Sequence, residues 1–386
     1  MKLIPKIALS LLAFMAVSAA VGVMNLSAAQ GDLLSSAPRH DVTPKRQPLD
    51  PAKPTVAVVL GADVTESTDV LGPYAVFAAS ERFNVVTVST TTRPVALTGG
   101  LDVVPDYTLT ELDHRLPSGS AVIVIPNMPH IRAPQNQPIV PWLQRHARSK
   151  ALLLSICYGA DTLALTGLRD GQAATSHWGD LGRLKRLHPQ VNWVTGQRYV
   201  DRGPLFGSAG ILSGIDAALH VVARLSEQAV ALNTAQTLQY PATRFLTSPR
   251  MPALQTQWSD GITLLNAAFL RDRRTVQVPL QAGVDELALA AVFDTQPAVY
   301  AARLRTSSDG AQVVTSRFGL RLVPALTPSP APCRGRRCPV KPSHSKKLCG
   351  TWRVTSTCPR RASQRGAWST APVRTTGLAR AGGAPW

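Results

Sequence analysis

A single cysteine lies where an aliphatic run meets a segment with helical spacing. In LLLSICYGADTLA the run ends at Cys157, and Gly159 opens the next element. A residue at a sharp strand-to-helix turn is held exposed, and the first N–H groups of the helix favour the thiolate form of a thiol placed there. The same N–H groups could stabilise an oxyanion. The stretch predicts a nucleophile or, as the alternative, the small apolar core residue that most free cysteines are.

The remaining cysteines do not pair with this one. All four lie near the carboxyl terminus, at Cys333, Cys338, Cys349 and Cys358. Their spacing lacks the paired C-x2-C knuckles of a zinc site, so we expect neither a metal nor a cofactor.

The elements that must position Cys157 lie between residues 55 and 226. TVAVVLGAD, FNVVTVST, SAVIVIP and ALLLSI predict buried strands, and VAL and LDVVPD predict a hairpin. Helical spacing follows most of these strands, which predicts one doubly wound α/β domain. Its sheet should be mostly parallel and flavodoxin-like, with helices on both faces. The reactive site of such a sheet lies at the carboxyl ends of its strands, where Cys157 is found.

The amino terminus has the pattern of an export signal. Lys2 and Lys6 precede an uncharged, largely apolar run over residues 7–23, and small residues follow up to Ala29. Residues 1–29 are therefore a signal peptide or, alternatively, a membrane anchor. Either interpretation predicts an exported protein, periplasmic or membrane-anchored on the extracytoplasmic side. Residues 30–54 carry five prolines and read as a linker.

The formal net charge of +18 belongs mostly to the tail. Residues 331–386 hold 12 Lys and Arg and no acidic residue, which leaves 29 basic and 23 acidic side chains in the first 330 residues. So small an excess of basic over acidic side chains does not indicate a nucleic-acid-binding surface in the globular part. The tail composition predicts a basic, disordered segment, and the abrupt change is also what a shifted reading frame would produce.

Residues 227–330 predict a smaller α/β extension. Within it, residues 283–324 parallel residues 62–105: Asp285 aligns with Asp69, AVF with AVF, and GLRLVP with GLDVVP. The similarity predicts a partial repeat of a helix, strand and hairpin that packs on or extends the sheet. Chance similarity between two amphipathic segments is the alternative.

The stretch around the thiol resembles a known family. SICYGADTLALTGLRDGQAATSHW is similar to the nucleophile elbow of the ThiJ/PfpI family, the Parkinsonism-associated deglycase superfamily with a class I glutamine amidotransferase-like fold. GLRDGQAATSHW resembles the GLLDGRRATTHW pattern of the family and contains His177. TDVLGP places Asp69 four residues before Pro73, as in the branch of isonitrile hydratase and the amino-terminal domains of AraC-type regulators. Residues 283–324 resemble the extension of a membrane-attached subgroup.

This resemblance implies a role for each residue. Cys157 would be the nucleophile, Asp69 would hydrogen-bond to the thiol and tune it, and His177 would act nearby as base or orienter. Tyr158 and Gly159 would line the oxyanion pocket. Tyr158 stands where His, Thr or a small residue is usual, so a Cys-His dyad on adjacent residues is absent and peptidase-like or glutaminase-like chemistry is disfavoured.

One charged residue and one charged segment are expected to lie on the surface without a role in the site. Glu66 is expected to be a solvated surface charge. The basic segment RLKRLH, residues 183–188, is expected to be a solvated helix face.

Three functions follow from these observations. The first is a thiol-dependent hydrolase or hydratase that acts on a small electrophile of the aldehyde, glycation-adduct or isonitrile class. The second is a non-catalytic ligand-binding or regulatory sensor module, as in AraC-type regulators. The third is a redox-responsive or chaperone-like protein that uses Cys157 as an oxidisable sensor. The expected partners are a small molecule, a second copy in a homodimer and, through the amino terminus, a membrane.

Overall fold

The computed structural model describes residues 3–34, 42, 48–253, 260–269, 274–298 and 302–325. The expectations for the tail, residues 331–386, and for most of residues 35–47 lie outside the described residues. The helices are α1 (Leu3–Leu34), α2 (Ser67–Ala79), α3 (Leu109–Arg115), α4 (Ile139–Arg148), α5 (Gly159–Ala164), α6 (Leu181–Leu187), α7 (Leu212–Leu225), α8 (Gln228–Thr237), α9 (Asp260–Phe269) and α10 (Glu286–Ala298), with short 3-10 turns at Pro134–Asn136 and Thr243–Leu246. The strands are β1 (Thr55–Leu60), β2 (Val64–Thr65), β3 (Asn84–Ser89), β4 (Val95–Leu97), β5 (Leu101–Val103), β6 (Tyr107–Thr108), β7 (Val122–Ile125), β8 (Leu152–Ile156), β9 (Ala173–Ala174), β10 (Asn192–Trp193), β11 (Tyr199–Arg202), β12 (Leu205–Ser208), β13 (Arg274–Pro279), β14 (Ala302–Ser307), β15 (Val314–Thr315) and β16 (Arg321–Val323).

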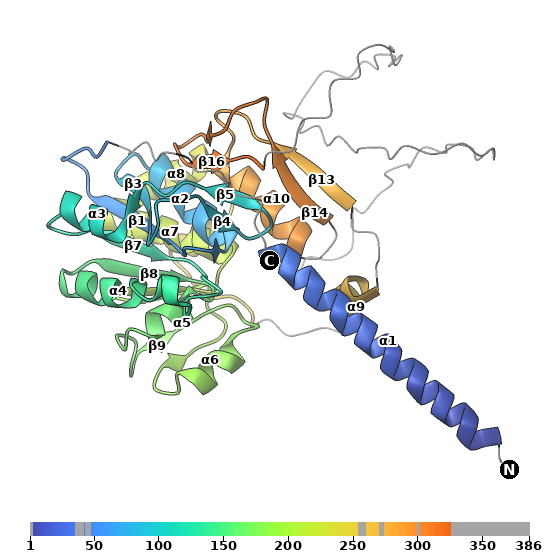
Figure 1. The fold of residues 1–386 in the computed structure, drawn as a ribbon. Coiled ribbons are helices and arrows are strands. Elements are labelled where there is room, and N and C mark those ends of the chain that lie inside the picture. The colour runs from blue at the N-terminus through green and yellow to red at the C-terminus, as the bar shows by residue number, and fades with distance from the viewer. Residues whose placement is uncertain are drawn as a thin grey trace, which may run out of the picture. The chain divides into compact units, whose positions relative to one another are not determined.

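A seven-stranded sheet forms the centre of the domain, in the order β11-β12-β8-β7-β1-β3-β6 (Figure 1). All neighbouring strands in it run parallel except β11 and β12, which pair antiparallel. The prediction of a mostly parallel, doubly wound sheet is confirmed. Parallel strands bring their carboxyl ends to one edge, so the residues that follow β1, β7 and β8 meet there.

Successive side chains of β1 enter two different cores. Val56, Val58 and Leu60 pack with the apolar side chains of α2, α7 and α8. Ala57 and Val59 point to the other face, where they pack with α3, α4 and α5. A strand buried on both faces explains why this stretch is apolar without interruption.

Residues 274–325 extend the domain with a second set of strands. β13 and β14 form a parallel pair, and a five-stranded sheet has the order β15-β16-β5-β4-β2. Along the chain, α10 is followed by β14 and then by the antiparallel pair β15–β16. All described residues belong to one compact unit.

The amino-terminal helix is longer than the apolar run suggests. α1 continues to Leu34, so residues 30–34, expected at the start of the linker, are helical. Among the described residues, Phe14–Leu34 is the one helical stretch long and apolar enough to cross a membrane, by length and composition. The end of α1 contacts the folded domain, because Gly99 N donates to Leu33 O at 2.9 Å and Arg303 pairs with Asp32 at 2.7 Å.

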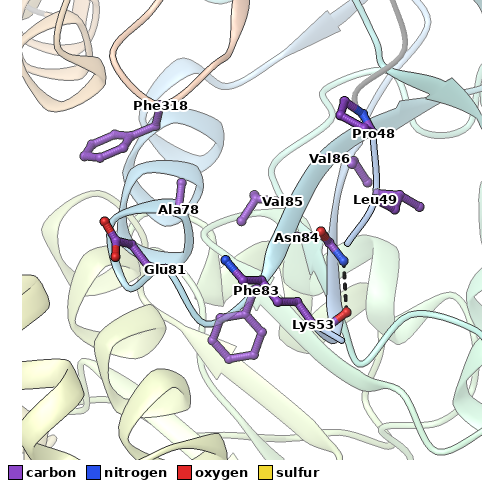
Figure 2. A pocket seen from close by; sticks show the side chains of 10 residues that line it. All are labelled: Pro48, Leu49, Lys53, Ala78, Glu81, Phe83, Asn84, Val85, Val86 and Phe318. Atoms are coloured by element: carbon purple, nitrogen blue, oxygen red, sulfur yellow. Dashed lines mark hydrogen bonds between the residues drawn. The ribbon is translucent and has the colours of Figure 1, made fainter. Parts of the chain in front are cut away.

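A cavity of about 400 Å³ lies where the central strands begin (Figure 2). Lys53, just before β1, and Asn84, the first residue of β3, both line it. This is the amino-terminal edge of the sheet and therefore the edge away from Cys157. It is not the place where a doubly wound sheet carries its reactive groups.

Candidate functional site

Cys157 occupies the strained turn that the sequence predicts. It follows β8 directly, precedes α5, and has a φ of 54°. A side chain in the left-handed region is strained and persists where the surroundings fix it. Gly159 is required for the turn, because a Cβ there would lie 2.0 Å from the backbone oxygen of Ile125.

A second glycine, which the sequence reasoning missed, packs directly on the thiol. A Cβ on Gly210 would lie 2.6 Å from Cβ and 2.9 Å from Sγ of Cys157, and Gly210 has a φ of 93°. The adjacent backbone also holds the turn, since Cys157 N donates to Ser208 O at 3.1 Å. Thus the loop after β12, the strand that pairs with β8, packs against the sulfur.

Two carboxyl groups from the turn after β1 face this thiol. Asp69 is 1% exposed; its Oδ2 accepts a hydrogen bond from Asn127 N at 3.0 Å, while its Oδ1 is buried without a hydrogen-bond partner among the described residues. Glu66 caps α2, since its side chain accepts from Asp69 N at 2.7 Å. The expectation that Glu66 is a solvated surface charge is wrong, because it lines the cavity of this site.

Burial and these carboxylates determine the ionisation of the site. Burial, and then the charge of Glu66, raise the pKa of Asp69 well above its ordinary value. Burial also raises the pKa of Glu66. Burial, followed by the charges of Asp69 and Glu66, raises the pKa of the Cys157 thiol. The expectation of a stabilised thiolate is therefore wrong: α5 has only six residues, and its dipole is outweighed. The resting state is a neutral thiol.

His177 reaches the site through Tyr158. Its Nδ1 lies 3.5 Å from the Tyr158 hydroxyl and accepts from Gly179 N at 3.3 Å, and no hydrogen bond joins His177 to the sulfur among the described residues. Burial lowers the pKa of His177, so the ring is neutral near pH 7. The neighbouring Ser176 ties this segment to the elbow, because its hydroxyl donates to Cys157 O at 2.8 Å.

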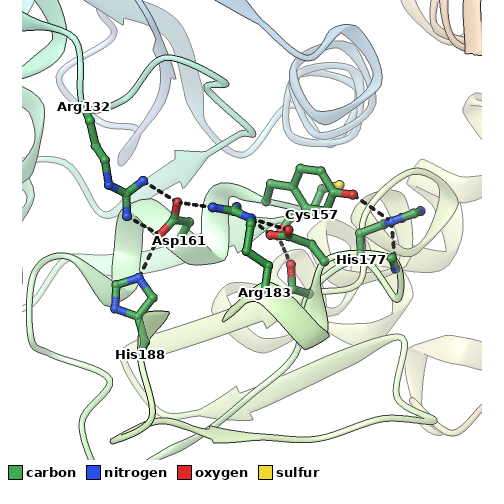
Figure 3. Close-up of polar contacts among 10 residues, drawn as sticks. Arg132, Cys157, Asp161, His177, Arg183 and His188 are labelled. Atoms are coloured by element: carbon green, nitrogen blue, oxygen red, sulfur yellow. Dashed lines mark hydrogen bonds and ion pairs between the residues drawn. The ribbon is translucent and has the colours of Figure 1, made fainter. Parts of the chain in front are cut away.

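An ion-pair network forms the next wall of the site (Figure 3). The Asp161 carboxylate accepts two hydrogen bonds from Arg132, at 2.6 and 2.9 Å; it also contacts His188 at 2.7 Å and Arg183 at 3.5 Å. Although burial raises it, the hydrogen bonds from Arg132 and His188 bring the pKa of Asp161 below its ordinary value. The segment 183–188 is thus not simply a solvated face, because His188 is buried and Arg183 lines the cavity.

A cavity of about 550 Å³ opens at this edge of the sheet. Cys157, which is 7% exposed, and Asp69 are not among its lining residues. Among the described residues, no cluster of His, Cys, Asp or Glu could hold a metal ion. The lining residues are Gln30, Leu33, Leu34, Glu66, Thr98, Asn127, Met128, Pro129, Arg132, Tyr158, Asp161, Arg183, Phe293 and Asp294.

Comparison with known proteins finds relatives of the part of the chain that carries Cys157, Asp69 and His177. The sequence profile described as DJ-1/PfpI family matches residues 54–224. The isonitrile hydratase of Pseudomonas putida is 29% identical over 178 residues, which cover 45% of this chain and 72% of the hydratase. The HTH-type transcriptional regulator CdhR of Pseudomonas aeruginosa is 29% identical over 143 residues, 37% of this chain and 41% of the regulator. The match thus spans less than half the length of that regulator.

Solved structures are similar over the same part of the chain. A THiJ/PfpI family protein from Pseudomonas syringae is 21% identical, with a TM-score of 0.45, and the match covers 56% of this chain and 87% of that one. A DJ-1 superfamily protein from Salmonella typhimurium is 23% identical, with a TM-score of 0.43, and the match covers 49% of this chain and 99% of that one.

Proposed function

Residues 54–224 of this chain are a DJ-1/PfpI family domain, and from that premise we propose that the protein is a thiol-dependent enzyme that adds water to a small electrophile. Cys157 is the nucleophile, and isonitriles and aldehydes, including glycation adducts, are the substrate classes. The observation that carries the proposal is the buried Asp69 carboxyl next to Cys157, whose pKa is raised well above its ordinary value by burial and then by the charge of Glu66. A carboxyl kept protonated in this way can give its proton to a bound molecule.

For an isonitrile, the proposed steps balance as the addition of one water molecule. The Asp69 carboxyl donates its proton to the terminal carbon, Sγ of Cys157 bonds to that carbon, and the thiol proton returns to Asp69, which leaves a thioimidate. Water then adds, with its hydroxyl on the carbon and its other proton on the nitrogen. The C–S bond breaks, the hydroxyl proton passes to sulfur, and an N-substituted formamide leaves.

His177 serves the water step in this scheme. Its ring is neutral because burial lowers its pKa, and a neutral imidazole can accept a proton from water and return it to the leaving group. Its Nδ1 lies 3.5 Å from the hydroxyl of Tyr158, and Tyr158 lines the cavity. The residue therefore acts on water and substrate rather than on the thiol.

The proposed location of the protein is outside the cytoplasm, attached to or facing a membrane. Lys2 and Lys6 before the apolar run support this proposal. So do the apolar side chains that α1 leaves open to solvent, among them Phe14 at 71% and Met24 at 70% exposed.

A sensor module is the second candidate, because the thiol is only 7% exposed and does not line the cavity. A buried, neutral cysteine suits a domain that binds a ligand without turning it over. The HTH-type regulators that match this chain support this candidate, although their whole length is far from covered.

The two candidates separate in a turnover assay on the full chain. Wild-type protein should convert a small alkyl isonitrile to its formamide, or an α-oxoaldehyde to its hydroxy acid. Cys157→Ser should abolish the conversion, and His177→Ala should lower kcat about 100-fold or more. Asp170→Asn, an exposed carboxylate on the same domain, is the matched control. Binding of these compounds without turnover by wild-type protein would instead establish the sensor.

A further inference from the structure

The repeat in the carboxyl-terminal part includes one more strand than the sequence comparison of residues 283–324 suggests. TVQVPLQA, which begins at Thr275, resembles TVAVVLGA, which begins at Thr55. These stretches form β13 and β1, and each strand pairs in parallel with the strand that follows the next long helix. Residues 55–105, the first copy, and residues 274–325, the second copy, thus both contain a β-α-β unit followed by an antiparallel strand pair.

The two copies pair with each other as a twofold axis requires. β5 and β16, which carry GLDVVP and GLRLVP, run antiparallel, and Leu322 lies opposite Val103. These two residues hold the same position in the two motifs, so each faces its own equivalent. The equivalent helices α2 and α10 also pack on each other. The contact between the copies is therefore isologous, which is the kind of contact that joins two identical subunits.

The second copy has no reactive site of its own. In the first copy, six residues separate Ala62 from Asp69, and Glu66 is one of them. In the second copy, only two residues separate Ala282 from Asp285, and the copy contains no cysteine. The second copy therefore keeps the strands and the helix that cover the first copy, without the turn that carries the acidic groups of the site.

The second copy instead contributes two side chains to the candidate site. Phe293 and Asp294, both on α10, line the cavity together with Tyr158, the residue that follows Cys157. Phe293 is 1% exposed and belongs to the core that includes the apolar side chains of α2. Its packing between the two copies fixes the position of this part of the cavity wall.

Asp294 differs from the other charged groups of the cavity wall. Arg132 and Arg183 both line the cavity, and both pair with Asp161. Glu66 is engaged as the cap of α2. Among the described residues, no hydrogen bond or ion pair engages the Asp294 carboxylate. Its charge can therefore act on a molecule in the cavity, and its replacement breaks no ion pair.

We propose that the second copy takes the place of a partner subunit on α2 and β5, and that it supplies Phe293 and Asp294 as specificity-determining residues for molecules that approach Cys157. The ring of Phe293 limits the size of these molecules. The Asp294 carboxylate favours cationic over anionic ones, because charges interact strongly in a partly dry cavity. The inference rests on the proposed function in taking this cavity as the approach to Cys157, but size and charge selection can be measured without turnover.

Charge selection is tested by the reaction of Cys157 in the full chain with a cationic and an anionic methanethiosulfonate of similar size. At pH 8 the Asp294 carboxyl is ionised, since burial and the charge of Glu66 raise its pKa to about 6. Asp294→Asn should lower the ratio of the cationic to the anionic rate about threefold or more. Asp285→Asn is the matched control, because Asp285 lies before α10 but pairs with Arg317. Mass spectrometry at the peptide level separates Cys157 from the tail cysteines.

Size selection is tested by Phe293→Leu, which shortens the cavity wall but keeps an apolar side chain in the core. The rate of Cys157 with N-cyclohexylmaleimide, divided by the rate with N-methylmaleimide, should rise about threefold or more, because the cavity widens. A general loosening of the fold would speed both reagents alike. Phe318→Leu is the control, since Phe318 belongs to the second copy but lines the other cavity (Figure 2).

The place of the second copy is tested by combining Val103→Cys with Leu322→Cys in a full chain whose tail cysteines are serine. Residues directly opposite each other in an antiparallel pair are close enough for a disulfide. Oxidation should join the two positions within one chain, which keeps the mass of a single chain. Linkage between two chains, or no linkage at all, would overturn the inference.

The two selectivity ratios decide the role of the second copy in the site. A ratio that Asp294→Asn or Phe293→Leu leaves unchanged, or that its control changes equally, would overturn the inference for that residue. Altered ratios in a protein that turns over no electrophile would leave the inference standing and contradict the proposed enzyme instead. Turnover with unaltered ratios would do the reverse.

Discussion

At the scale of residues, the chemistry depends on a thiol that is neutral at rest. Cys157 sits on a strained turn as a nucleophile does, yet burial and the charges of Asp69 and Glu66 raise its pKa. In the proposed enzyme, this thiol becomes nucleophilic when its proton passes to the nearby carboxyl after a substrate binds. This coupling protects the sulfur from unselective reaction between turnovers.

Alkylation of Cys157 should therefore be slower than that of a free thiol at pH 7. The charge that the Asp69 carboxyl acquires when it ionises opposes the thiolate. Asp69→Asn cannot acquire that charge, so alkylation of Cys157 at pH 8 should be about tenfold faster, which corresponds to one pKa unit. Peptide-level mass spectrometry follows the reaction, with Asp170→Asn as control. A wild-type rate equal to that of a free thiol would refute the neutral ground state.

Substitution of Gly210 should be costly because of its contact with Cys157. Gly210→Ala forces a Cβ against Cys157 in addition to a positive φ, so it should cost about 3 kcal/mol or more of unfolding free energy. Gly203 has a φ of 70° and nothing within 4 Å of its added Cβ. Gly203→Ala isolates the backbone cost, about 1–2 kcal/mol. Denaturant unfolding compares the two, and equal costs would show that the contact with Cys157 does not matter.

At the scale of elements, the site is built from turns that belong to different parts of the chain. The turn after β1 supplies the carboxyls, β8 supplies the thiol, and α10 from the repeat supplies Asp294. The pairing of β16 with β5 attaches the carboxyl-terminal segment that contains α10 to the first domain. The repeat should therefore unfold together with the first domain.

Leu322→Ala tests that coupling. Leu322 is fully buried on β16, so its truncation should cost about 2–5 kcal/mol and leave one cooperative unfolding transition. Leu225→Ala, at a side chain 45% exposed, should cost less than about 1 kcal/mol. Two separate transitions would show that residues 274–325 fold on their own.

The pH dependence of stability should reveal Asp294. Its folded-state pKa of about 6 lies above the ordinary value of 3.8, so the folded protein favours the neutral carboxyl. The stabilisation is present below pH 3.8 and is lost as the pH rises through 6. The Asp294→Asn variant cannot ionise at this position, so it does not lose this stability as the pH rises. The melting temperature of the variant minus that of the wild type should therefore be larger at pH 7 than at pH 4. A difference that does not change with pH would contradict the raised pKa.

The strands and helices of the domain and the position of Cys157 could be predicted, because they depend on residues that are close together in the sequence. Cys157 and Gly159 adjoin an apolar strand, and the strand itself follows from its composition. Glu66, Arg132 and Asp294 could not be assigned to the site, because tertiary packing alone brings these distant positions to one cavity. The ionisation of Cys157 was predicted in the wrong direction, since sequence reveals the helix that follows a thiol but not the depth of its burial.

At the scale of the whole molecule, a globular domain is joined to a long apolar helix whose end lies at the cavity. Leu33 and Leu34 line that cavity. The homodimer that the sequence suggests remains a prediction. It would have to use a face other than α2 and β5, since α10 and β16 cover them.

Export is the prediction that belongs to this scale. A full-length fusion to a reporter active only outside the cytoplasm should score positive, because the lysines and the apolar run have the pattern of an export signal. Replacing Lys2 and Lys6 with glutamate should weaken the signal. Accumulation of the full-length fusion in the cytoplasm would contradict the proposed location and favour the sensor.

The measurement that tests the central claim most directly is the mass of the covalent intermediate. Full-length protein is mixed with a small alkyl isonitrile, quenched in acid within the first turnovers, and digested for mass spectrometry. We expect the peptide that contains Cys157 to gain the mass of one isonitrile molecule, the adduct to disappear as formamide forms, and Cys157→Ser to show neither. Formamide production by Cys157→Ser, or turnover by the wild type without any adduct on Cys157, would contradict the account.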